Sequence, residues 1–268
     1  MKFGCALMER LTKPLGNSEQ TRSADVGAKA APLLAVLAFL AAWHLLSLRY
    51  PPFILPGPLA VAQVFAQKLG DGTLLPHALT TLTEALGGLL AGGAVGAVCG
   101  YLIARSPLAE RLLSPFIAAS QGIPVVAIAP LLFIWFGSGL GAKILVCALV
   151  VFFPITINVA AGVRGIPKAW RDLFQAMRAT RREILFKLEI PGALPVILAG
   201  LRIGATLSVI GAVIGEFLSS TSGLGFLIKQ GTGLYDTPLV MLGVVCIMIV
   251  ALGLYGGAKA LEKLAIKD

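Results

Sequence analysis

Six long apolar segments, separated by shorter polar stretches, set the pattern of this chain of 268 residues. They lie at about 31–48, 81–104, 113–136, 144–163, 192–215 and 238–257. An α-helix rises about 1.5 Å per residue, so roughly 20 residues cross a hydrocarbon core of about 30 Å. The pattern therefore predicts an all-α, polytopic membrane protein with six transmembrane helices. Composition agrees, because 57% of the residues are hydrophobic and 13% are charged, whereas soluble domains are about one quarter charged.

Basic residues are distributed unevenly between the two sides of these segments. Of the 22 Lys and Arg residues, one lies inside a span, Arg202, and few fall on one side: Arg49, Lys68, Lys143 and Lys229. Cytoplasmic loops of membrane proteins are enriched in Lys and Arg, so both termini and residues 164–191 are expected in the cytoplasm. This bias also explains the net charge of +9 without nucleic-acid binding. Residues 1–30 would form a cytoplasmic tail, and residues 31–268 a single transmembrane domain.

The polar stretches on the opposite side carry short apolar pieces of their own. Residues 51–78 are expected to form a short interfacial helix after an extended start. Residues 219–238 read as a glycine-rich loop with a short apolar helical turn.

Small residues form a stripe along the second apolar segment, at Gly88, Gly92, Gly96 and Gly100. Glycines four residues apart share one face of a helix, where they let another helix backbone approach closely. The stripe predicts helix packing inside the bundle, with a seam between two copies of the chain as the alternative.

Proline and polar residues mark the third, fourth and fifth segments as candidates for a solute pathway. Proline at membrane depth is tolerated where a cavity or neighbouring helices satisfy the freed carbonyls, and the interrupting residues are Pro115, Pro124, Pro130 and Pro154. Candidate pathway residues are Ser120, Gln121, Asn158, Thr206, Ser208 and Glu216. They could equally form interhelical hydrogen bonds. The ionisable groups at depth (Glu84, Arg202 and Glu216) are expected to be structural more often than solute-binding, with Glu84 and Glu216 near ends that water can reach.

The longest polar loop has the pattern of two short helices joined by a corner. After Pro167, the apolar residues Trp170, Leu173, Phe174 and Met177 form one stripe on a first helix. Thr180 and Glu183 fit a capping box, so a second helix is expected to follow a corner at Ala179–Thr180 and to end near Pro191. A basic amphipathic helix could lie on anionic lipid. A rigid corner favours a second interpretation, a docking site for a cytoplasmic protein.

The same loop resembles that of a known family. The run GVRGIPKAWRDLFQAMRATRREILFKLEIPGALP (162–195) is similar, without gaps, to the coupling loop of binding-protein-dependent ABC importer permeases. That family's motif is Glu-Ala-Ala, a Gly four residues later, and an Ile/Leu-x-Leu-Pro ending. The corresponding residues here are Asp172, Leu173, Phe174, Arg178 and the ending Leu188–Pro191, so Arg178 replaces the Gly at the corner. The run AGLRIGATLSVIGAVIGEFLSSTSGLGFLI (199–228) is similar to the nitrate, taurine and sulfonate branch, especially to its riboflavin and thiamine-pyrimidine-precursor relatives.

The resemblance implies the type I ABC importer architecture, with 31–268 as the permease domain and a coupling loop at about 164–191. It implies a homodimer in the bacterial cytoplasmic membrane, two copies of a separate ATPase subunit and an extracytoplasmic solute-binding protein. ATP would be used by the ATPase, so no cofactor is expected on this chain. The implied docking residues are Trp170, Asp172, Leu173, Phe174, Met177, Arg178, Ala179, Thr180, Arg181 and Glu183. The solute would be small and polar or heteroaromatic: a vitamin-type solute such as riboflavin or the thiamine pyrimidine precursor first, then nitrate, taurine or an alkanesulfonate.

The sequence offers few alternatives to a translocation component without enzymatic activity. It has no GxxxxGK[ST] phosphate-binding loop, its two His residues lie in no HExxH motif, and its cysteines show no CxxC spacing, so neither catalysis nor a metal site is expected. A stand-alone secondary transporter remains the alternative. It would need coupling groups near the bilayer centre, where the sequence places Arg202, and the chain shows no internal repeat. A scaffold that binds a partner through the same loop is a further possibility.

Overall fold

The computed structural model describes residues 18–266, and these residues divide into two compact units that meet at Pro58 and Leu59. Most of the predicted cytoplasmic tail, residues 1–17, lies outside the described residues. The first unit holds helix α2 (Ser18–Ser47), which begins within the predicted tail and contains the apolar stretch Leu34–Ser47. A loop after α2 folds back on the helix, because the indole Nε1 of Trp43 donates a hydrogen bond to the carbonyl of Pro56 at 3.0 Å.

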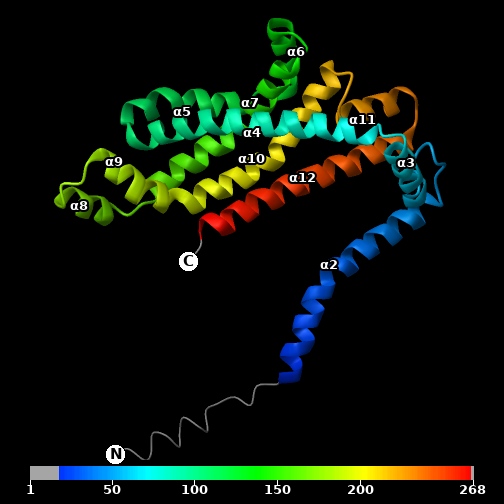
Figure 1. The fold of residues 1–268 in the computed structure, drawn as a ribbon, viewed down its shortest axis with the longest axis horizontal. Coiled ribbons are helices and arrows are strands. Elements are labelled where there is room, and N and C mark those ends of the chain that lie inside the picture. Colours follow the sequence, from blue (N-terminus) through cyan, green and yellow to red (C-terminus); the bar gives the residue numbers. More distant parts are fainter. Residues whose placement is uncertain (1–17, 267–268) are drawn as a thin grey trace, which may run out of the picture. The chain divides into compact units, whose positions relative to one another are not determined.

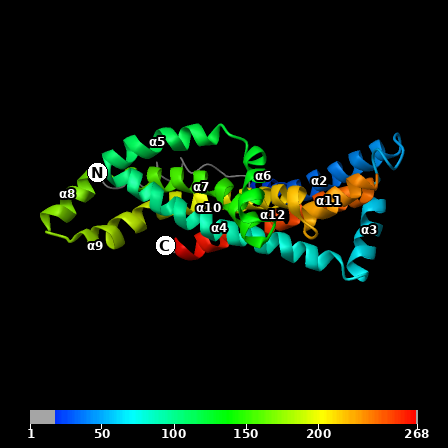
Figure 2. The same cartoon turned by 90° about the horizontal axis from the view of Figure 1, so that it is seen from above.

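The second unit is a bundle of long helices with shorter helices at its two ends. In chain order it contains α3 (Pro58–Gly70), α4 (Leu74–Arg105), α5 (Pro107–Gln121), α6 (Val125–Phe136), α7 (Leu140–Arg164), α8 (Lys168–Ala176), α9 (Arg181–Ile184), the π-helix η1 (Leu185–Glu189), α10 (Ile190–Ser219), α11 (Leu224–Gly233) and α12 (Thr237–Ala265). Figures 1 and 2 both show α8 and α9 at one end of α4, α7 and α10, and α11 near the other end. The predicted short helices within 51–78 and 219–238 are thus confirmed as α3 and α11.

The prediction of membrane-spanning helices is confirmed for four segments. Among the described residues, α4, α7, the continuous helix from Arg181 to Ser219, and α12 are long and apolar enough to cross a membrane. The pair α5 and α6 makes a fifth if it is counted as one bent span. The predicted first span corresponds to Leu34–Ser47, a shorter apolar helix.

The predicted third span, 113–136, is not one continuous helix, and the predicted interruption at Pro124 is confirmed. It is broken into α5 and α6, whose axes differ by 102°. The break falls at residues 122–124, and Pro124 stands at the N-cap of α6 in an extended conformation. Proline cannot donate a backbone hydrogen bond and disfavours helix in the residue before it. Pro115, Pro130 and Pro154, by contrast, lie inside α5, α6 and α7 without ending them.

The centre of the bundle is the contact of α4 with α7, and the glycine stripe makes it possible. A Cβ added at Gly88 would lie 2.0 Å from the Cβ of Cys147, and one at Gly92 would lie 2.3 Å from the carbonyl oxygen of Ala148. Gly96 and Gly100 face the same helix, at the carbonyls of Phe152 and Thr156. The four glycines therefore pack α4 against α7 of the same chain. Of the two predicted roles of the stripe, this is helix packing inside the bundle.

Helix α7 also packs against α10, so it is covered on two sides. A buried cluster of Val151, Ile155, Val159, Val163 and Ala193 fills this contact. At the edge of the bundle, Arg202 of α10 pairs with Glu262 of α12, with a separation of 3.2 Å between Nε and Oε2. The predicted structural role of Arg202 agrees with this pairing.

Candidate functional site

The helical corner, which we define as residues 168–189, comprises α8, α9 and η1 and lies at one end of the bundle (Figure 1). The predicted capping box is confirmed. The Thr180 hydroxyl accepts a hydrogen bond from the Glu183 backbone N–H at 3.3 Å, and Glu183 Oε2 accepts one from the Thr180 backbone N–H at 2.9 Å. Just before it, Arg178 has φ of 54°, in the left-handed region. That conformation favours glycine, which is the residue that the family motif has at this position.

The prediction that the second helix ends near Pro191 is wrong. Helix α9 continues through η1 directly into α10, as one helical stretch from Arg181 to Ser219. In η1 the backbone N–H of Ile190 donates to the carbonyl of Leu185, five residues earlier, which widens the turn. Pro191, which has no backbone N–H to donate, follows this turn directly, in the first turn of α10.

The inner side of the corner is packed by its own apolar residues together with Ile166, which lies just before it. Ile166, Ile184 and Leu188 are buried together, and Phe174 and Ala179 pack against them. Phe174, one of the expected docking residues, thus points mainly into the corner and holds the two short helices together.

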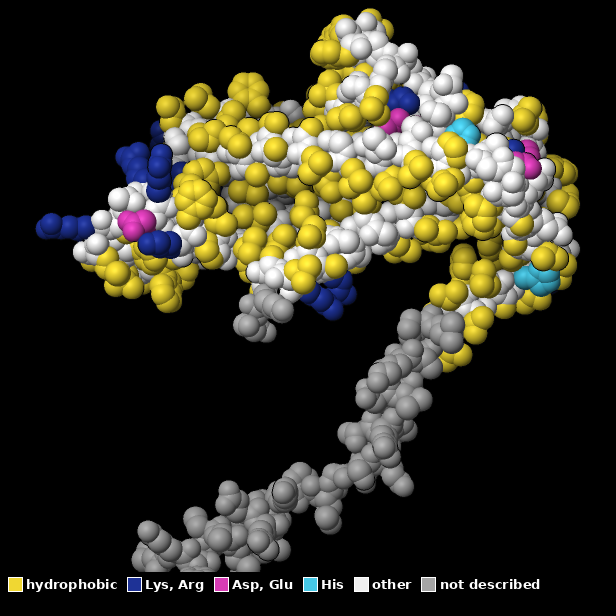
Figure 3. All heavy atoms as spheres, viewed as in Figure 1, with side chains coloured by type: hydrophobic (Ala, Val, Ile, Leu, Met, Phe, Trp, Pro, Cys, Tyr) yellow, Lys and Arg dark blue, Asp and Glu magenta, His cyan; other side chains and the backbone are white. Residues whose placement is uncertain are grey.

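The outer side of the corner presents an apolar surface that the described chain leaves open. The side chains of Trp170, Leu173 and Met177 form what we call the docking face, with exposures of 55%, 51% and 71%. Asp172, Arg178 and Arg181 are also exposed around it. Figure 3 shows Lys and Arg side chains gathered at this end of the molecule, while hydrophobic side chains cover the flanks of the bundle. An apolar centre with a charged rim is the usual composition of a protein–protein interface.

The candidate pathway residues are not brought together in one site. The hydroxyls of Ser120, Thr206 and Ser208 each donate to a carbonyl in the preceding turn of their own helix. Asn158 Nδ2 likewise donates to the carbonyl of Pro154 at 2.8 Å. Their hydrogen bonds are thus local, as is common for such residues inside helices.

Gln121 differs, because it lines a cavity. The cavity has a volume of about 330 Å³ and lies between α4, α5 and α7, with Ser114, Thr156 and Arg164 also in its wall. Arg164 forms an ion pair with Glu110 at 2.9 Å. Of the six predicted pathway residues, Gln121 is the one in the wall of this cavity, where it shares the space with Thr156 of α7.

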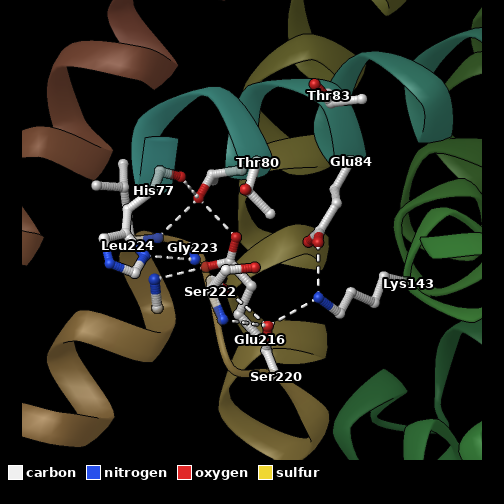
Figure 4. Close-up of polar contacts among 12 residues, drawn as sticks. His77, Thr80, Thr83, Glu84, Lys143, Glu216, Ser220, Ser222, Gly223 and Leu224 are labelled. Carbon is white, nitrogen blue, oxygen red and sulfur yellow. Dashed lines mark hydrogen bonds and ion pairs between the residues drawn. The ribbon is translucent and has the colours of Figure 1, made fainter. Parts of the chain in front are cut away.

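At the opposite end of the bundle, polar side chains from four segments form a buried cluster (Figure 4). Lys143 Nζ of α7 lies 2.8 Å from Glu84 Oε1 of α4 and donates to the hydroxyl of Ser220 at 2.8 Å. Lys143 is 6% exposed and Glu84 is 0% exposed. A buried ion pair requires close geometry and further hydrogen bonds to offset the loss of water, and Ser220 supplies one of them. The expectation that water reaches Glu84 is therefore wrong.

Glu216 completes the cluster by holding the start of α11. Its carboxylate accepts hydrogen bonds from the Thr81 hydroxyl at 2.6 Å and from the Gly225 backbone N–H at 2.5 Å, and the residue is 0% exposed. Gly223 has φ of 111°, and a Cβ there would lie 2.1 Å from the carboxylate. His77 Nδ1 accepts from the Gly223 backbone N–H at 2.9 Å (Figure 4). Glu216, expected near water and among the pathway residues, is instead fully buried and fixes the loop between α10 and α11.

Comparison with known proteins assigns the family. Residues 92–265 match the family described as binding-protein-dependent transport system inner membrane component. The chain is 43% identical to the riboflavin transport system permease protein of Chloroflexus aurantiacus, over 88% of this chain and 87% of that one. It is 31% identical to the formylaminopyrimidine transport permease protein of Halalkalibacterium halodurans, over 88% and 94%, and 33% identical to the taurine transport system permease protein of Escherichia coli, over 87% and 85%.

The fold is also that of a solved transporter. A chain of the MetNI methionine ABC transporter in an inward-facing conformation superposes with a TM-score of 0.66 and 20% identity, covering 75% of this chain and 99% of that one. At this identity the likeness supports the fold, the type I importer architecture that the resemblance implied. Taken with the family match, it confirms a multi-pass plasma membrane protein. This chain belongs to the binding-protein-dependent inner membrane components and is the permease subunit of an ABC importer.

Proposed function

We propose that this permease imports a small heteroaromatic solute of the riboflavin type, driven by a separate ATPase that docks on the helical corner. In this proposal the corner faces the cytoplasm, a binding protein delivers the solute to the opposite end, and two copies of the chain form the pathway. The solute class is supported by the 43% identity to a riboflavin permease, which exceeds the 31% and 33% to formylaminopyrimidine and taurine permeases.

The docking face is the observation that carries the proposal. Trp170, Leu173 and Met177 are all more than half exposed, yet the helix that bears them is fixed in place by the packed inner side of the corner. A helix that merely lies on lipid needs no such support, whereas a rigid surface is what a protein partner can move as a body. Basic residues concentrated at this end agree with a cytoplasmic position (Figure 3).

Docking can be tested by purification of the complex from native membranes. We expect a Walker-motif ATPase to co-purify with the parent protein and to be lost when Leu173 and Met177 are both changed to Asp. Leu234→Asp is the matched control, because Leu234 is 67% exposed on the turn between α11 and α12, at the opposite end. Retention of the ATPase by the double variant, at the level of the control, would refute the docking face. A Phe174 variant is unsuitable here, since it would disturb the corner itself.

The same purification separates the importer from a stand-alone secondary transporter. Solute uptake by the purified permease alone in proteoliposomes, without an ATPase, would favour the secondary transporter. The importer predicts uptake only when ATPase, binding protein and ATP are all present.

The solute can be tested with the full importer in proteoliposomes. Labelled riboflavin, formylaminopyrimidine and taurine would be offered separately, each with the binding protein encoded for this system. We expect ATP-dependent uptake of riboflavin and weaker or no uptake of taurine. Uptake of taurine alone would refute the heteroaromatic solute class while leaving the permease assignment intact.

The cavity beside Gln121 is the part of the pathway that we propose touches the solute. Its volume of about 330 Å³ suits a small organic molecule, and Gln121 and Thr156 offer both hydrogen-bond donors and acceptors. Gln121→Ala should raise the solute concentration needed for half-maximal uptake without loss of the ATPase, whereas Ser208→Ala should leave uptake unchanged, because Ser208 is 0% exposed and bonds its own helix.

A further inference from the structure

A third buried carboxylate, besides Glu84 and Glu216, lies at the base of the helical corner, in a place that neither docking nor the solute pathway explains. Glu189 is the last residue of η1 and is 0% exposed. Its Oε2 accepts a hydrogen bond from the Tyr101 hydroxyl at 3.1 Å. Its Oε1 forms an ion pair with Arg105, at 3.5 Å from Nη1. Tyr101 and Arg105 are one turn apart on α4. The carboxylate therefore ties η1 to the end of α4.

Arg171 brings helix α8 to the same carboxylate. Its Nη2 donates a hydrogen bond to the carbonyl of Val163 in the last turn of α7. Its Nε lies 3.9 Å from Glu189 Oε1. Within residues 18–266, both of these facing atoms are buried and neither has a hydrogen-bond partner. An arginine–carboxylate hydrogen bond spans about 2.7–2.9 Å, so a relative movement of about 1 Å would close this contact.

The surroundings allow such a movement. An apolar cavity of about 330 Å³ adjoins Glu189, with Tyr101, Val163 and Leu185 in its wall. Glu189 also belongs to a π-helical turn, and π-helical turns occur frequently at functional sites. The adjoining cavity and the widened turn leave room for the end of η1 to shift.

We infer that Glu189 is a positioning residue that passes the movement of α8 to α4. In this inference, which rests on the proposed ATPase docking, the packed corner moves as a body with the bound ATPase. Arg171 then approaches the carboxylate of Glu189, which Tyr101 and Arg105 hold at the end of α4. The closed contact passes the movement through Tyr101 and Arg105 to the end of α4. The contact between Arg171 and Glu189 has two arrangements. In the open one Nε and Oε1 are 3.9 Å apart, and in the closed one they form a hydrogen bond. A docked partner can shift the equilibrium between the two arrangements.

A purely stabilising ion cluster would be built differently. It would satisfy its buried atoms within the fold, since an unpaired buried charged group is costly, as the Glu216 carboxylate does through Thr81 and Gly225. Glu84 Oε2 also lacks a hydrogen-bond partner among the described residues, whereas at Glu189 the unpaired oxygen faces an unpaired donor, Arg171 Nε, at 3.9 Å. The open contact between Arg171 and Glu189 therefore points to a moving part.

The test is the amount of solute moved per ATP hydrolysed, measured with the complete importer in proteoliposomes. We expect Glu189→Gln to keep the ATPase bound and hydrolysing, while solute moved per ATP falls by about tenfold, the factor that corresponds to one charge-assisted hydrogen bond. Lys187→Met is the matched control, because it also removes one charge from η1, from a side chain that is 65% exposed and pairs with Glu183 on the surface. It should leave the ratio unchanged.

A second variant keeps the inference testable if Glu189→Gln does not assemble. Tyr101→Phe removes the hydroxyl contact on α4 and retains every charge, and it should lower the solute moved per ATP by a smaller factor. A normal ratio in every assembled variant, with the ATPase bound, would overturn the inference but leave docking intact. Failure of the parent protein to bind an ATPase would overturn docking and this inference together.

Discussion

A methyl group added at Gly92 should separate the two central helices of the bundle. The Cβ of Gly92→Ala would lie 2.3 Å from the carbonyl oxygen of Ala148, 2.8 Å from its Cα and 2.9 Å from its carbonyl carbon. Carbon atoms in good contact are about 3.5–4.0 Å apart, so α4 and α7 must move apart by about 1 Å. The atoms in the way belong to the backbone of α7, which cannot rotate aside as a side chain can.

The cost follows from overpacking. Forcing an extra methyl group into a packed core typically costs about 1–3 kcal/mol, of which up to about 1 kcal/mol is recovered because Ala favours helix over Gly. For a chain of this size, about 1 kcal/mol shifts Tm by roughly 2–4 °C. We therefore expect Gly92→Ala to lower Tm of the protein in mild detergent by a few degrees, measured by intrinsic fluorescence during heating.

Two other Gly→Ala substitutions, at Gly93 in α4 and Gly253 in α12, control for the helix preference of alanine. A Cβ at Gly253 in α12 meets no atom of the described residues within 4 Å, and one at Gly93 meets the tip of Ile155 at 3.3 Å, a side chain that can shift. Both variants should keep or raise Tm. If Gly92→Ala were as stable as these controls, the glycine stripe would not be set by the contact between α4 and α7.

Three further substitutions test the corner and the buried cluster. Arg178→Gly should raise Tm or leave α8 better ordered, because a left-handed residue with a side chain costs about 1–2 kcal/mol; slower hydrogen exchange in α8 would show it, and faster exchange would contradict it. Thr180→Ala should remove about 1 kcal/mol of helix capping and weaken ATPase binding, with recovery in Thr180→Ser; a variant that binds normally would exclude a role for the cap in docking. Glu84→Gln should destabilise the bundle by about 3–5 kcal/mol, because it leaves the Lys143 ammonium buried without its ion partner. Adding Lys143→Met should restore much of this loss in thermal unfolding, and no recovery would mean that the pair is not the cause.

Much of the fold could be predicted from the sequence because its elements are set by local pattern. Long apolar runs identify α4, α7, α10 and α12, and the i, i+4 glycines identify the packing face of α4. The bend between α5 and α6 was less predictable. Proline at position 124 predicts an interruption, but the 102° angle depends on what each half packs against. The passage of the helix through Pro191 was mispredicted, because a π-helical turn leaves no signature in composition or periodicity.

The two ends of the bundle differ in how far their sites could be predicted, and the reason is sequence separation. The corner is built from neighbours, such as Thr180 and Glu183 three residues apart, so its shape can be inferred from a capping pattern and an apolar stripe. In the buried cluster, Lys143 and Glu84 are 59 residues apart, and Thr81 and Glu216 are 135 residues apart. Pairing over such distances is decided by which helices pack together. In an apolar span, however, an isolated carboxylate is costly enough to require a partner. From the sequence, Glu84 and Glu216 are instead expected near span ends that water can reach. Their need for partners follows only from the packing of α4, α7 and α10, which buries them.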